Sequence, residues 1–157
     1  MSVAPYLDAI DLAYDRQSWH GTNLRGSLRG VTAGQAAWRP ARGRHNIWEL
    51  AVHAAYWKYA VLRRLTGAKR GSFALEGSNW FARPVQPTDA AWKADLALLE
   101  RTHRELRAAV AALPAARLRA RVQGKRTAAW LLAGIAAHDL YHAGQIQLIK
   151  RLRQGQR

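Results

Sequence analysis

The sequence contains no cysteine among its 157 residues. This absence excludes disulfide bonds, thiolate zinc sites and a cysteine nucleophile. Any metal ion bound by the chain must therefore be held by histidine or carboxylate side chains. A chain of this length is expected to form one domain, spanning residues 1–157, and to bury a core without metal staples. A bound metal would then serve function rather than folding.

Acidic residues are scarce, with 10 Asp and Glu against 25 Lys and Arg, which gives a net charge of +15. Such a balance is typical of proteins that bind polyanions. However, the basic residues are spread from Arg16 to Arg157, and a GC-rich genome would also favour Arg and Ala. The sequence has no helix-turn-helix signature, no RNA-binding motif and no face that interleaves aromatic and basic residues. A non-catalytic protein that binds nucleic acid or another polyanion is the competing interpretation, and it is not favoured.

Long apolar runs are absent as well. No segment has 18 apolar residues without a charge, and the N-terminus lacks the basic stretch, apolar core and small-residue site of a secretory leader. We therefore expect a cytoplasmic protein that does not associate with a membrane.

Only five prolines occur, and all of them fall at the ends of periodic segments. Between these positions apolar residues recur every three or four residues, which indicates helices. The sequence predicts an all-α fold, a four-helix bundle with helices over residues 6–28, 46–66, 88–113 and 127–152. No strand is predicted. The connections after the first and second helices are long, and at least one is expected to cross over the end of the bundle.

Two of these helices have marked starts. Asn46 precedes an apolar helix and is followed by Glu49 three residues later, the spacing of a capping box. Thr127 is the expected N-cap of the fourth helix. The third helix has an uninterrupted stripe with steps of four and three, typical of a bundle core. This stripe consists of Trp92, Leu96, Leu99, His103, Leu106, Val110 and Leu113.

Three of the six histidines indicate a metal site. His138 and His142 lie four residues apart on the apolar side of the fourth helix, so their side chains emerge one turn apart, about 5–6 Å between Cβ atoms. Two imidazoles at this spacing can both reach one ion at about 2.0–2.1 Å. His53 shares a helix face with Leu50 and Trp57 and is the best candidate for a third ligand. The spacing alone is equally typical of a helix that binds no metal.

Four further residues are candidates for supporting the site or for meeting a substrate. Gln145 lies on the ligand side of the fourth helix. Glu49, one turn before His53, suits a general base, although the capping box already explains it. His103 falls in the core stripe of the third helix, where we expect it to bond to a backbone carbonyl. Trp80 lies in the second connection, where a tryptophan often covers a pocket or a partner surface.

Three neighbouring residues are expected to contribute less. Asp139 and Tyr141 flank the ligand pair but point off its face by about 100° per residue, so they would support the site from outside at most. His45 precedes the cap of the second helix and is expected to face solvent.

Three segments resemble the DinB-like (DinB/YfiT) superfamily of metalloenzymes. Its two signature regions are similar to HNIWELAVHAAYWKYAVLRRLTG, residues 45–67, and GIAAHDLYHAGQIQLIKRL, residues 134–152. Its connection between helices 1 and 2 is similar to LRGVTAGQAAWRP, residues 28–40. The most specific part is the pattern H-D-x-Y-H-x-G-Q-I over residues 138–146. The resemblance implies a four-helix bundle with a crossover connection and a divalent metal ion held by His53, His138 and His142.

The resemblance also carries functional expectations. Some branches of that family are transferases or isomerases that use low-molecular-weight thiols such as bacillithiol or mycothiol. It therefore implies a thiol-dependent S-transferase or isomerase that acts on a small molecule and pairs as a homodimer. A bundle with an empty site that serves only for dimerisation is also compatible with it.

The residues themselves leave several alternatives open. A three-His site keeps coordination positions free, where an ion could activate either a thiol or a water molecule. A metal-dependent hydrolase is therefore the alternative to thiol transfer. All-nitrogen ligation suits zinc or nickel, and the sequence does not choose between them. It also assigns no catalytic side chain.

Overall fold

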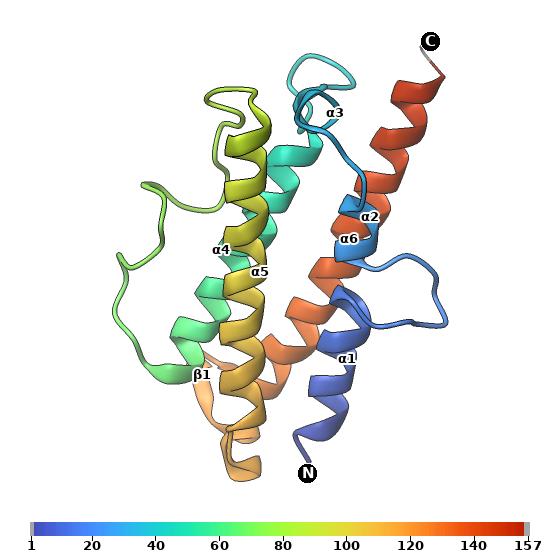
Figure 1. Cartoon of the computed structure of the whole chain (residues 1–157). Coiled ribbons are helices and arrows are strands. Elements are labelled where there is room, and N and C mark those ends of the chain that lie inside the picture. The colour runs from blue at the N-terminus through green and yellow to red at the C-terminus, as the bar shows by residue number, and fades with distance from the viewer. Residues whose placement is uncertain (1, 156–157) are drawn as a thin grey trace.

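The computed structural model describes residues 2–155 and confirms the all-α class predicted from the sequence (Figure 1). Its four main helices are α1 (Ala4–Tyr14), α4 (Ile47–Thr66), α5 (Asp89–Ala111) and α6 (Ala128–Gln154). The shorter elements are α2 (Leu24–Leu28), α3 (Ala33–Ala37), the 3-10 helix η1 (Ala115–Arg119), β1 (Arg121–Gln123) and β2 (Arg126–Thr127). Within residues 2–155, no helix has the length and apolarity needed to cross a membrane.

The second connection determines how the main helices are arranged. In Figure 1, α4 and α5 both begin at the top and end at the bottom, so these two consecutive helices are parallel. Residues 67–88 return along the length of the bundle to join them, whereas the first connection passes through α3 at the top end of the bundle before α4 begins. α1 and α6 run in the opposite direction. The packed pairs include α4 with α5, α1 with α6, and α4 with α6.

The predicted helix starts are confirmed. The Asn46 side chain accepts a hydrogen bond from the Glu49 backbone N–H at 2.8 Å, and the Glu49 carboxylate accepts one from the Asn46 backbone N–H at 3.4 Å. Thr88 caps α5 and Thr127 caps α6 in the same way, each through its side-chain oxygen. α4 ends at Gly67, whose φ of 75° lies in the left-handed region that favours glycine.

The prediction of one continuous helix over residues 6–28 is wrong. α1 ends at Tyr14, and the chain leaves the helical path until α2 begins at Leu24. The Asn23 side chain caps α2 by accepting from the Gly26 backbone N–H at 2.8 Å, and it donates to the Arg16 carbonyl at 2.8 Å. Residues 15–23 are almost entirely polar, so a helix there would have no apolar face to bury, and side-chain bonds to the backbone replace it.

The expectation of no strands also needs correction. β1 and β2 form a small antiparallel hairpin before α6. Its turn contains Gly124 at φ 55°. Strands of three and two residues are too short to show an alternating pattern, which is why the sequence did not reveal them.

Buried apolar side chains form two clusters that occupy successive levels of the bundle. The first includes α4 up to Ala55 and α6 from Ala143 onward. The second includes α4 from Val61 and α6 up to Ala136. Along α4 and α6, the positions between these two sets include the buried polar residues Lys58, Asp139 and His142.

We define the polar layer as four buried side chains that carry polar atoms, one from each main helix: Tyr14, Lys58, His103 and Asp139. The Lys58 ammonium donates to the Asp139 carboxylate, and both side chains are almost completely buried. The Tyr14 ring stacks on His103 with 3.6 Å between centroids, and Lys58 Nζ lies 4.9 Å from the Tyr14 ring centre. One ion pair, one cation–π contact and one ring stack therefore connect the four helices in this layer.

Candidate metal centre

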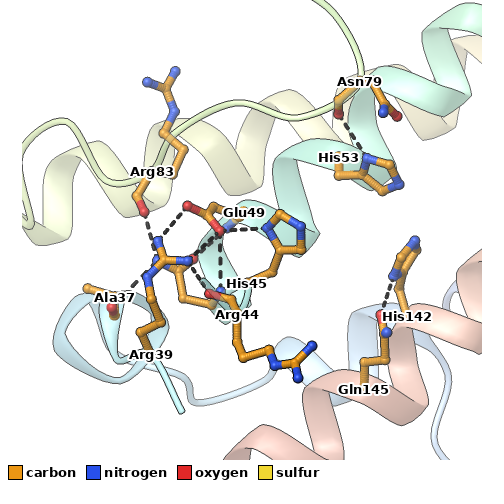
Figure 2. A network of polar contacts seen from close by, with 11 residues as sticks. Ala37, Arg39, Arg44, His45, Glu49, His53, Asn79, Arg83, His142 and Gln145 are labelled. Carbon is orange, nitrogen blue, oxygen red and sulfur yellow. Dashed lines mark hydrogen bonds and ion pairs between the residues drawn. The ribbon is translucent and has the colours of Figure 1, made fainter. Parts of the chain in front are cut away.

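The three histidines predicted as ligands lie together between α4 and α6. His138 Nε2 is 3.1 Å from His53 Nε2 and 3.0 Å from His142 Nε2. One ligand atom from each ring can be chosen so that all lie within 4.8 Å of one another, and no other such group of His, Asp or Glu occurs among residues 2–155. Figure 2 shows His53 and His142 reaching toward one another from the two helices.

The Nδ1 atoms of His53 and His142 are the outer nitrogens of the cluster, and their hydrogen bonds determine which ring atoms carry protons. His53 Nδ1 lies 2.8 Å from the Asn79 carbonyl oxygen, which can only accept, so this nitrogen must be the donor. His142 Nδ1 donates in the same way to Gln145 Oε1 at 2.7 Å. In their neutral forms these two rings therefore present Nε2 lone pairs toward His138.

The arrangement of ring protons and lone pairs suits a cation bound between the three rings. A neutral His138 has one ring proton, so its Nε2 can donate to at most one of the two neighbouring Nε2 atoms, and its Nδ1 is buried with no partner among the described residues. A divalent ion would satisfy all three lone pairs at once. Two nitrogens that are each about 2.0–2.1 Å from a tetrahedral ion lie about 3.3–3.4 Å apart. The observed separations of 3.0 and 3.1 Å are close to that value.

Burial keeps the three rings neutral. Desolvation lowers the pKa of His53 to about 4, although the bond to Asn79 opposes this, and it lowers the pKa of His138 to about 3. The pKa of His142 is also lowered, again by burial. Since neutral imidazole is the form that binds metals, the site offers three nitrogen donors at neutral pH.

The second connection forms one wall of the site. Trp80 stacks on His53 with 3.8 Å between ring centroids, and its other face stacks on His45 at 3.6 Å. Asn79 holds this segment in place, because its carbonyl bonds to His53 and its Oδ1 accepts from Trp57 Nε1 at 2.9 Å. Trp80 therefore covers one face of the His53 ring. His45 is exposed, as expected, and it also contacts Trp80.

The Glu49 carboxylate is fully engaged by other groups. It accepts from Arg39 at 2.6 and 3.0 Å and from His45 Nδ1 at 2.9 Å, in addition to its capping bond with Asn46 (Figure 2). Burial alone would raise the pKa of Glu49, but the bonds from Arg39 and His45 outweigh it and lower the pKa. These contacts leave little capacity for Glu49 to act as a general base.

The comparisons with known proteins place the chain in a family. A family model of the DinB superfamily matches residues 16–146. The chain belongs to the DinB superfamily. The matched segment includes His53, His138, His142 and Gln145. No curated protein and no solved structure matches this DinB superfamily member.

His103 lies apart from the three clustered rings of this DinB superfamily member. It stacks on Tyr14, and its buried Nδ1 has no hydrogen-bond partner among the described residues, so the expected bond to a backbone carbonyl is absent. Burial lowers its pKa to about 3, and the Lys58 charge adds to this effect. The ring therefore belongs to the polar layer.

Two important contacts were not anticipated from the sequence. Asp139 was expected to point off the ligand face, and its side chain pairs with Lys58 rather than with a histidine, but its complete burial in an ion pair was not foreseen. The burial of Lys58 could have been inferred from the sequence, because Lys58 lies in the apolar stripe that includes Ala54 and Val61. Nothing in the local sequence around Asn79 indicated that its carbonyl would orient His53.

Replacing His103 by Phe is expected to make the free energy of unfolding less dependent on pH. Below the ordinary pKa of 6.5 the unfolded chain protonates this histidine, whereas the folded chain does so only near pH 3. Stability should therefore fall as the pH decreases through this window, by up to about 1.4 kcal/mol per pH unit. Phe can stack on Tyr14 but cannot take up a proton.

The measurement is urea unfolding of both proteins at pH 7 and pH 5 with a chelator present. The parent should lose about 1–2 kcal/mol more than the variant over this interval. Equal losses would show that His103 is not held neutral by the fold.

Proposed function

We propose that the chain is a divalent-metal-dependent enzyme whose ion is held by His53, His138 and His142, and whose nucleophile is a low-molecular-weight thiol. The observation that supports the metal most strongly is the orientation of the rings. Asn79 and Gln145 fix protons on the outer nitrogens of His53 and His142, so that their free lone pairs meet at His138. Either zinc or nickel suits three nitrogen donors.

The chain would contribute binding and exclusion of water. Three histidine ligands leave at least one position free for a reactant. A divalent ion in this place would supply Lewis acidity, which lowers the pKa of a neighbouring thiol or water. Trp80 covers the His53 side, and the hydrogen bonds that His53 and His142 donate to Asn79 and Gln145 hold these two rings in a fixed orientation.

The state of the nearby carboxylates favours a thiol over water as the nucleophile. Glu49 is bound by Arg39 and His45, and Asp139 is paired with Lys58, so neither is free to take a proton from water. A thiol in contact with a divalent ion would be deprotonated outright, whereas water in the same place would still have a pKa of about 7. This difference supports a transferase or isomerase rather than a hydrolase.

Three other expectations are part of this proposal. A thiol cosubstrate suits a cytoplasmic protein, because that compartment keeps thiols reduced. Pairing as a homodimer stays a prediction, to be checked by the mass of the protein in solution. The net charge of +15 suits an acidic small-molecule substrate as well as a polyanion.

Elemental analysis tests the metal, and turnover tests the reaction. Protein purified without a histidine tag should contain about one equivalent of zinc or nickel, and His142→Ala should contain far less because it lacks one of three ligands. His20→Ala is the matched control, since His20 is exposed and its side chain lies near Ser18, away from the three clustered histidines. Equal low content in the parent and His142→Ala would contradict the metal assignment.

The reaction is assayed with cysteine as the thiol and 1-chloro-2,4-dinitrobenzene as the electrophile. Metal-loaded parent should accelerate thioether formation, and chelation or His142→Ala should remove the acceleration. Hydrolysis of 4-nitrophenyl acetate without a thiol, with no effect on thioether formation, would favour the hydrolase instead.

A further inference from the structure

A small apolar pocket of about 230 Å³ borders His138, one of the three clustered histidines. Its apolar walls include Trp57 and Val61 from α4, and Trp130 and Ile135 from α6. A larger hollow of about 860 Å³ between α2 and α5 touches none of the three histidines. The small pocket is therefore the one placed to present a molecule to the candidate metal centre.

Gly134 leaves room in this pocket. It lies on α6 one turn before His138, and a Cβ built at this position meets no atom within 4 Å. Glycine in a helix interior costs about 1 kcal/mol relative to alanine. Here the absence of a side chain leaves the space next to His138 unfilled, which gives a structural reason for a glycine at this position.

Two arginines give the pocket a positive charge. The Arg64 guanidinium lies 5.6 Å from the Trp57 ring centre, and that of Arg126 lies 4.5 Å from the Trp130 ring centre. Both arginines line the pocket, and neither forms an ion pair with a carboxylate of residues 2–155. Stacking on a ring holds each guanidinium in a defined place.

The charged side chains that act on Arg64 are also positive. Burial lowers the pKa of Arg64, and Arg63, Arg70 and Arg126 lower it further. An anion bound at this position would therefore relieve repulsion among the arginines as well as pair with them.

We propose that this pocket binds the apolar body of a small organic carboxylic acid, whose carboxylate pairs with Arg64 and Arg126 while its reacting end lies beside His138. The acid is the second substrate of the reaction proposed above, so its role in turnover rests on that function. Binding itself uses only side chains of α4, the hairpin and α6. It is therefore expected in metal-free protein too.

The test uses 4-phenylbutyrate and its uncharged amide, 4-phenylbutyramide, as probes in isothermal titration calorimetry. The acid should bind the full-length parent at least about tenfold more tightly than the amide, with or without zinc, because only the acid pairs with the arginines. Arg126→Gln should reduce this preference severalfold. Gly134→Leu should weaken binding of both probes at least tenfold, because its side chain fills the pocket.

Gly144→Leu is the matched control, since Gly144 is an exposed glycine of the same helix with equal space around it, and it lines none of the pockets described above. It should bind both probes like the parent. Zinc content is measured in every variant, so that loss of the pocket and loss of the metal are separated. Absence of probe binding to the parent, equal binding of acid and amide, or unchanged binding by Gly134→Leu would each overturn the proposal.

Discussion

Lys58→Met is expected to lower the free energy of unfolding by about 3–5 kcal/mol, the range observed when one partner of a buried ion pair is removed. Lys58 is 0% exposed and Asp139 is 1% exposed, so the remaining carboxylate could not turn to solvent. One oxygen of Asp139 already has no hydrogen-bond partner among the described residues. Burial raises the pKa of Asp139, an effect that the Lys58 charge opposes and that would be unopposed in the variant.

Urea unfolding at pH 7 measures this loss. The double variant Lys58→Met, Asp139→Leu should recover most of it, because two apolar side chains of similar size leave no unpaired charge. Lys93→Met is the exposed control on α5 and should change stability by no more than about 0.5 kcal/mol. A loss below about 1 kcal/mol for Lys58→Met would show that the pair does not hold the core together.

His138→Gln is expected to weaken zinc binding by about 100- to 1,000-fold. His138 Nε2 is the one atom that contacts both other rings, so its loss removes the centre of the cluster. Four-ligand zinc sites bind with about 10–16 kcal/mol, which corresponds to roughly 2.5–4 kcal/mol per ligand. Each 1.4 kcal/mol is a factor of about ten in affinity.

Competition with a chromogenic chelator gives both affinities under the same conditions. His20→Gln, which replaces an exposed histidine away from the cluster, should match the parent. If His138→Gln bound zinc within about threefold of the parent, the ion would have to lie elsewhere, and the three-His assignment would be wrong.

The sequence predicted the structure correctly where the residues that determine a feature all lie within one helix. α4 was predicted at both ends because Asn46, Glu49 and Gly67 provide a start and a stop within the segment itself. The spacing of His138 and His142 placed two rings on one face for the same reason. The first helix was predicted too long because an apolar pattern resumes at Leu24, while the polar stretch before it favours a loop.

Contacts between segments that are distant in the sequence could not be predicted in this way. Asn79 lies 26 residues from His53, and Lys58 lies 81 residues from Asp139. No periodicity relates these positions, since their distance in space depends on how α4, α6 and the second connection pack. The inward position of His53 followed from its helix face, but its partners required the fold.

The ion pair of Lys58 and Asp139 has a consequence for how α4 and α6 are aligned. Sliding one helix along the other by a single turn, about 5.4 Å, would separate two charges in a region with almost no access to solvent. The same two helices carry all three imidazoles, and Asp139 is the immediate neighbour of His138. The pair therefore favours a single alignment of α4 and α6, and in that alignment His53 lies beside His138 and His142. A substitution that let the two helices slide would displace the three imidazoles relative to one another without touching any of them.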